Sequence, residues 1–129
     1  MITWNNLDKL TSYQELEKTE SVDLAAVMAG ENGAERVKNY SVPMAEGLAY
    51  NYAAKKVDDT VLAALEKLAE EAQLTEKFEA LYNGEVVNTG EKRLVLHHMT
   101  RGQLGDAVEA DGVDKRTFYV EQQKKIAEF

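Results

Sequence analysis

The chain has 129 residues, 44% hydrophobic side chains and a net charge of −8. This length is typical of one domain, which buries roughly two thirds of the surface that its unfolded form exposes. The sequence lacks cysteine, which excludes disulfides and thiolate metal sites. Its acidity disfavours nucleic acid as a partner, because basic residues occur only as isolated pairs such as Lys115-Arg116. We expect a cytoplasmic protein without a membrane span.

The first third of the chain predicts short helices. Apolar residues recur every three positions over residues 4–17, as on one face of a helix. Ser21 is a candidate N-cap for a second helix, which Gly30 ends, and a helical turn follows the Asn32-Gly33 turn.

Residues 39–55 alternate in polarity on both sides of Glu46-Gly47, which predicts a β-hairpin. Pro43 cannot donate to a sheet, so its strand is expected at an edge or to end there. Residues 58–74 follow with an apolar stripe at helical spacing, capped by Asp58 or Asp59. We expect this helix to bury its leucines, so that Leu65→Ala costs about 2–5 kcal/mol. These leucines are Leu62, Leu65 and Leu68.

Further helices are expected along the second half. Thr75 is a candidate cap for a helix that Gly84 ends and that turns Phe78, Leu81 and Tyr82 inward. Another helix is expected from Glu91 to Thr100. It is broken by the Gly102–Gly105 loop.

Val108 and Val113 flank an Asp111-Gly112 turn, and a last helix occupies residues 114–129. This helix ends without a glycine cap, which indicates a chain cut short. The fold class predicted is α+β, mostly helical with one or two small β-hairpins.

The histidines are the first candidates for chemistry. His97 and His98 are adjacent, so on a helix they diverge by about 100° and cannot both chelate one ion. His97 follows Leu94 by three positions, which favours a hydrogen-bonded place on the apolar face.

The remaining candidates all have a structural explanation. Glu70-Glu71 lie on the polar face of a predicted helix, and Asp58-Asp59 at its start, where the helix dipole favours negative charge. The Gly102–Gly105 segment lacks the flanking elements of a phosphate-binding loop. Ser12, Ser21 and Ser41 are outside any nucleophile motif, and the tyrosines of the hairpin favour packing. We therefore predict no catalytic, cofactor-binding or metal-binding residue among positions 1–129.

A family resemblance rests on several short motifs in a preserved order. Residues 82–88, Tyr-Asn-Gly-Glu-Val-Val-Asn, and residues 93–97, Arg-Leu-Val-Leu-His, resemble the segment that precedes the sugar-binding domain in glucose-6-phosphate isomerases. Upstream, residues 34–37, Ala-Glu-Arg-Val, resemble that family's Ala-Glu-Arg-Phe. The sequence departs from the family at Asn51, where an aspartate is usual, and at Ala53-Ala54, which replace Ser-Lys.

The resemblance implies an N-terminal segment of an enzyme that interconverts glucose 6-phosphate and fructose 6-phosphate in glycolysis and gluconeogenesis, without a cofactor. It implies the N-terminal part of an α/β sugar-isomerase (SIS-type) fold, with residues 1–129 as a single N-terminal domain or fragment. The expected partners are the rest of a homodimeric parent chain, and sugar phosphate for that parent only. Its catalytic groups are expected after Phe129, so the isolated chain is expected to be inactive. The alternative is a free-standing acidic module that binds a protein partner.

Overall fold

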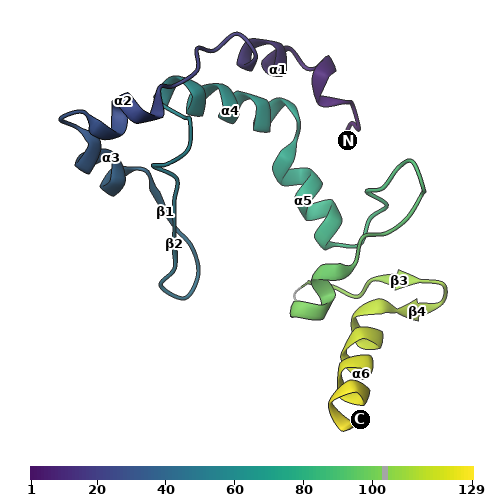
Figure 1. Ribbon diagram of the computed structural model, residues 1–129. Helices are drawn as coiled ribbons and strands as arrows, with labels where there is room; N and C mark the ends of the chain where they lie inside the picture. Colours follow the sequence, from purple (N-terminus) through teal and green to yellow (C-terminus); the bar gives the residue numbers. More distant parts are fainter. Residues whose placement is uncertain (103–104) are drawn as a thin grey trace. The chain divides into compact units, whose positions relative to one another are not determined.

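The computed structural model describes residues 1–102 and 105–129. About half of these residues are helical, and their strands form two small antiparallel sheets of two strands each (Figure 1). The predicted α+β class with small hairpins is therefore confirmed. The chain divides into two compact units, residues 5–71 and residues 1–4 with 72–129, and each is described by itself.

The unit of residues 5–71 begins with an interrupted helix. A 3-10 turn, η1 (Leu7–Lys9), and helix α1 (Thr11–Leu16) are separated by Leu10, which has an extended backbone with φ −81° and ψ 140°. The continuous helix predicted over residues 4–17 is therefore wrong. The interruption occurs because the Glu71 carboxylate caps α1, accepting the backbone N–H groups of Thr11 and Ser12 at 3.2 and 2.8 Å.

Two short helices follow, α2 (Leu24–Ala29) and α3 (Gly33–Asn39), and they pack against each other. The N-cap of α2 is Asp23, whose side chain accepts the N–H of Ala26 at 3.1 Å, so the prediction of Ser21 was wrong by two residues. Gly30 ends α2 as predicted.

The predicted hairpin is confirmed. Strands β1 (Ser41–Pro43) and β2 (Ala49–Asn51) pair antiparallel, with Val42 opposite Tyr50. Both turn residues, Glu46 and Gly47, have positive φ, which is the backbone geometry that tight hairpin turns need. The strand β1 ends at Pro43, where the missing N–H costs no ladder bond.

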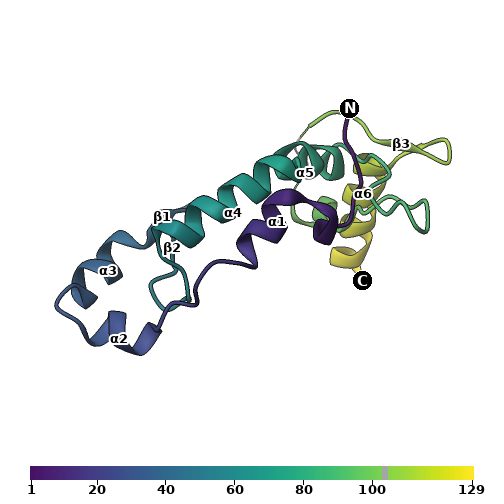
Figure 2. The same cartoon turned by 90° about the horizontal axis from the view of Figure 1, so that it is seen from above.

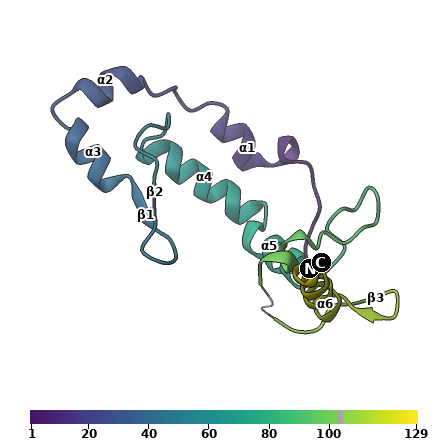
Figure 3. The same cartoon turned by 60° about the horizontal axis from the view of Figure 1, so that its bottom comes forward.

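Helix α4 (Asp59–Glu71) is the longest element of this unit, and α1 packs along it (Figures 2 and 3). Asp58 caps it by accepting the Val61 N–H at 2.8 Å, as one of the two predicted caps. Val61 is buried, but Leu65 is 39% exposed and Leu62 and Leu68 are only half-buried. The prediction of a buried Leu65 is therefore wrong for this chain, because the short α1 covers only part of the apolar stripe.

Arg36 on α3 holds the end of the hairpin. Its buried guanidinium donates to the carbonyl oxygens of Ala53, Lys55 and Val57 at 2.7–2.9 Å. The same group lies over the Tyr40 ring, 4.1 Å from its centroid. One side chain thus fixes the path of the loop that leads into α4.

The second unit begins with α5 (Leu74–Tyr82). The residue before it, Gln73, has a left-handed backbone and accepts the N–H and hydroxyl of Thr3 at 2.8 and 2.9 Å. Thr75 lies inside the helix, so the predicted cap is wrong. Phe78, predicted to face inward, is 64% exposed, and Ala80 is the buried residue.

Gly84 stops helix α5 just after its last residue, Tyr82, as predicted. The N–H of Gly84 reaches the Leu81 carbonyl at 3.2 Å, and that of Glu85 reaches the Ala80 carbonyl at 2.9 Å. This pair of bonds is the Schellman arrangement, which places its glycine in the left-handed region, here at φ +74°.

The helix predicted from Glu91 to Thr100 is wrong over its first part. Asn88 and Arg93 form an antiparallel bridge, and the Asn88 side chain accepts the Glu91 N–H at 3.2 Å. Lys92 has φ +52°, which turns the chain back where a helix would continue. Only the short 3-10 helix η2 (His97–Arg101) remains.

The last elements are a second hairpin and a helix. Strands β3 (Glu109–Ala110) and β4 (Val113–Asp114) turn through Asp111 and Gly112, which confirms the predicted turn. Helix α6 (Lys115–Glu128) follows. Asp114 caps it, accepting the N–H groups of Arg116 and Thr117 at 3.1 and 3.3 Å.

Candidate functional site

The two histidines do not form a metal or catalytic pair. His97 is exposed, whereas His98 is half-buried and stacks on Tyr82 with ring centroids 4.6 Å apart. The His98 Nε2 lies 3.2 Å from the Tyr82 carbonyl, and its Nδ1 is buried without a partner. The prediction that His97 occupies the apolar side is wrong: His98 takes that place. Across residues 1–102 and 105–129, no group of three or more acidic or histidine side chains is arranged to hold a metal ion.

The paired carboxylates have structural roles. Asp59 accepts the Tyr40 hydroxyl at 3.1 Å. Burial, and then this hydrogen bond, raise the pKa of Tyr40 above its ordinary value. Glu71, predicted to be solvated, caps α1, and its hydrogen bonds from the Ser12 hydroxyl and N–H lower its pKa. Glu70 is exposed, as predicted.

Gly102, Gly105 and the serines have structural surroundings in the described part of the chain. Gly102 follows η2, and Gly105 lies beside Arg116, whose Nη2 would be 3.1 Å from an added Cβ. The other predicted loop residues, Gln103 and Leu104, lie outside the described residues.

Ser12 is buried with its hydroxyl on Glu71, whereas Ser41 lies in a strand and Ser21 is exposed. The hydroxyl of Ser12 therefore bonds to a carboxylate and not to a histidine.

Arg116 links separate segments of the second unit, and no local sequence pattern predicts these contacts. The side chain is only 6% exposed, and its guanidinium donates to the carbonyl oxygens of Tyr82 and Asp106. The guanidinium also lies 5.8 Å from the centroid of the Tyr82 ring. Arg116 therefore joins the end of α5 to the start of α6.

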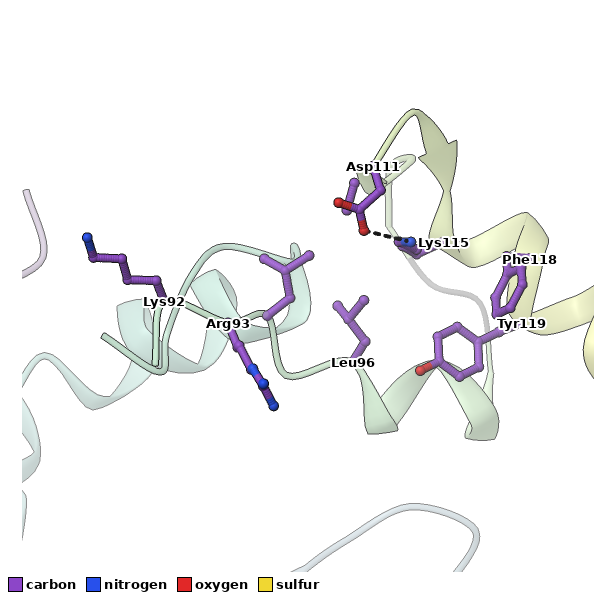
Figure 4. Close-up of a pocket in the computed structure, with 9 residues that line it drawn as sticks. Lys92, Arg93, Leu96, Asp111, Lys115, Phe118 and Tyr119 are labelled. Carbon is purple, nitrogen blue, oxygen red and sulfur yellow. Dashed lines mark hydrogen bonds and ion pairs between the residues drawn. The ribbon is translucent and has the colours of Figure 1, made fainter. Parts of the chain in front are cut away.

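An open hollow of about 490 Å³ lies in this unit between the loop after residue 88, the second hairpin and α6. In Figure 4, Leu96, Phe118 and Tyr119 face its centre, while Lys92 and Arg93 lie on one side and Lys115 on another. Lys115 pairs with Asp111 at 3.4 Å. We call this hollow the α6 groove. Its lining is Lys92, Arg93, Leu94, Leu96, Ala110, Asp111, Lys115, Phe118 and Tyr119.

The α6 groove is suited to contact rather than catalysis. A proton-transfer site needs a base with a tuned pKa beside the reacting carbon. The carboxylate of the groove, Asp111, is largely exposed and is paired with a lysine. Its apolar floor and basic edge instead suit the packing of another polypeptide segment.

Comparison with known proteins shows the family. Residues 51–129 match the sequence model of the phosphoglucose isomerase family. The chain is 52% identical over 98% of its length to a glucose-6-phosphate isomerase of Treponema denticola. It is 39% identical over 99% of its length to the enzyme of that name from Treponema pallidum, and 37% over its whole length to that of Borreliella afzelii.

The chain belongs to the phosphoglucose isomerase family. It spans about a quarter of the length of these curated relatives, 25% of the Treponema denticola enzyme and 24% of the Borreliella afzelii enzyme. The prediction of a segment of a glucose-6-phosphate isomerase is therefore confirmed, and the comparisons do not favour a free-standing interaction module.

In the part of the chain that the structure describes, no helix is long and apolar enough to cross a membrane.

The residues that sequence reasoning missed are those defined by contacts between distant segments. In the sequence, Arg36 stands out only as part of the Ala-Glu-Arg motif, and Arg116 only as part of a basic pair. Both are buried, and both bind backbone carbonyls far along the chain. For Arg36 the available signal is Tyr40 four residues later, whose ring lies under the guanidinium. Tyr82 lies 34 residues before Arg116, so no local pattern marks that contact.

Proposed function

We propose that this chain is the N-terminal structural portion of a glucose-6-phosphate isomerase. The parent enzyme would interconvert glucose 6-phosphate and fructose 6-phosphate in the cytoplasm as a homodimer. The proposal is carried by one observation: 52% identity over nearly the whole chain to an isomerase four times as long. In this view residues 1–129 form one N-terminal domain, which positions the rest of the enzyme and takes no part in proton transfer.

The chemistry of the reaction supports this division of labour. Moving a proton between two carbons of a sugar phosphate requires a positioned base, donors for the enediolate oxygen and an anchor for the phosphate. The candidates of this chain are otherwise engaged: Glu71 caps α1, Asp58 caps α4, and His98 stacks on Tyr82. The remaining three quarters of the enzyme would supply all three requirements. The reaction needs no metal or cofactor from this segment.

A chimera tests the proposal. This chain replaces the matched segment of the Treponema denticola enzyme, and isomerisation of fructose 6-phosphate is measured by a coupled assay. We expect activity close to that of the unaltered enzyme, because positions that only support the fold tolerate substitution when packing is kept. The control lacks the segment and should be inactive. A chimera that folds, as judged by a cooperative thermal transition, yet does not isomerise would contradict the proposal.

A further inference from the structure

The α6 groove has an apolar floor built from two separate stretches of the chain. Leu94 and Leu96 come from the segment before η2, and Phe118 and Tyr119 come from the first turns of α6. Figure 4 shows Leu96, Phe118 and Tyr119. Phe118 is 42% exposed, although aromatic side chains bury a large area when they are covered. The groove therefore presents unused apolar surface held on a defined backbone.

The edge of the groove is basic within an acidic chain. Lys92, Arg93 and Lys115 line it with the one carboxylate Asp111, so the lining carries a net charge of +2, from three cations and one anion. The whole chain carries −8. This local excess of positive charge favours a partner surface with carboxylates.

The arrangement of the charges argues against a small anion. In Figure 4 the side chains of Lys92 and Arg93 point in different directions, and neither points toward Lys115. Lys115 is already engaged with Asp111 at 3.4 Å and lies 6.0 Å from the centroid of the Phe118 ring. Phosphate recognition needs converging donors, whereas charges spread around an apolar floor fit a longer segment.

We propose that the α6 groove docks a segment from the remaining three quarters of the isomerase chain, with apolar side chains over Phe118 and carboxylates against Lys92 and Arg93. This inference rests on the proposed function, because it takes its occupant from the longer relatives of this chain. Phe118 within the groove is 42% exposed. Exposed apolar surface of this kind marks an interaction site.

Lysine labelling tests the docking. An amine-reactive acetylating reagent is applied to the isolated chain and to the chimera with the Treponema denticola enzyme, and rates are read by mass spectrometry at Lys92 and Lys115. We expect both lysines to react at least about fivefold more slowly in the chimera, since a covered side chain reacts only when the contact opens. In the chimera, Arg93→Glu should restore the labelling rate of Lys115. Arg101→Glu, the same charge change on an exposed residue outside the groove, should leave it unchanged.

The outcomes separate this inference from the proposed function. An active chimera whose groove lysines react as fast as in the isolated chain overturns the docking and leaves the proposed function standing. A folded but inactive chimera with protected lysines supports the docking and counts against the proposed function. Protection in the isolated chain that disappears on dilution would assign the groove to a second copy of this chain, which also overturns the proposal.

Discussion

Gly84 gives the sharpest test of how the second unit is built. It ends α5 at φ +74°, and a Cβ at this position would lie 2.2 Å from Cγ1 of Val108. Gly84→Ala therefore adds two costs, a left-handed backbone of roughly 1–2 kcal/mol and overpacking of about 1–3 kcal/mol. Alanine also restricts the unfolded chain, which offsets about 0.4–1 kcal/mol. We expect a net loss of about 1–4.6 kcal/mol in the free energy of unfolding.

The matched control is Gly112→Ala in the same unit. Gly112 has φ +73°, but nothing lies within 4 Å of the Cβ that alanine would add. This control isolates the backbone cost, so it should lose no more than about 1.6 kcal/mol. The assay is urea denaturation of each variant, followed by far-ultraviolet circular dichroism at one temperature.

A substitution of Val108 provides a second check on the overpacking cost of Gly84→Ala. Val108 is 4% exposed and contributes the methyl groups that the new Cβ would meet. Val108→Ala in the Gly84→Ala background should recover part of the loss, with a coupling of about 0.5–3 kcal/mol. Equal losses for Gly84→Ala and Gly112→Ala, with no coupling to Val108, would refute the reasoning.

Two other predictions concern α6 and α4. The hydrogen bond from the Thr117 hydroxyl is the largest effect on Asp114 and lowers its pKa below 3.8. Burial, the second-largest effect, opposes this, and the N–H groups of Arg116, Thr117 and Val108 add to the lowering. The cap therefore stabilises the fold fully above pH 3.8, and its contribution falls as the pH drops through the lowered pKa. Asp114→Ala should lower the urea midpoint at pH 7 but have little effect on it in acid. An equal effect of the substitution at both pH values would contradict this prediction. Leu65→Ala should cost less than about 2 kcal/mol in the isolated chain, because its side chain is 39% exposed; a cost in the range of a buried leucine would contradict this.

Local signals predicted the elements that short stretches of sequence determine. The hairpin around Glu46-Gly47, the turn at Asp111-Gly112 and the glycine that ends α5 all follow from backbone geometry that few residues adopt. The apolar spacing of residues 58–74 likewise predicted α4. In these cases the information lies within a few neighbouring residues.

Contacts across the chain decided the rest. The carboxylate of Glu71 starts α1 sixty residues away in sequence from Thr11, and no local pattern reveals this. The helix predicted from Glu91 failed because Asn88 and Arg93 pair across a turn. Leu65 was expected inside because helical spacing identifies an apolar face but not what covers it. The α6 groove could not be predicted from local sequence either, because its floor is formed by two stretches that are separate in the sequence.

The central claim is that this chain supports an isomerase without carrying its chemistry. The most direct measurement is a coupled assay with fructose 6-phosphate on the rigorously purified chain, in parallel with His97→Ala and Glu70→Gln. We predict no turnover above the blank, because residues 1–102 and 105–129 show no positioned base beside an anchor for the phosphate. Turnover that survives purification and disappears in either variant would contradict the account.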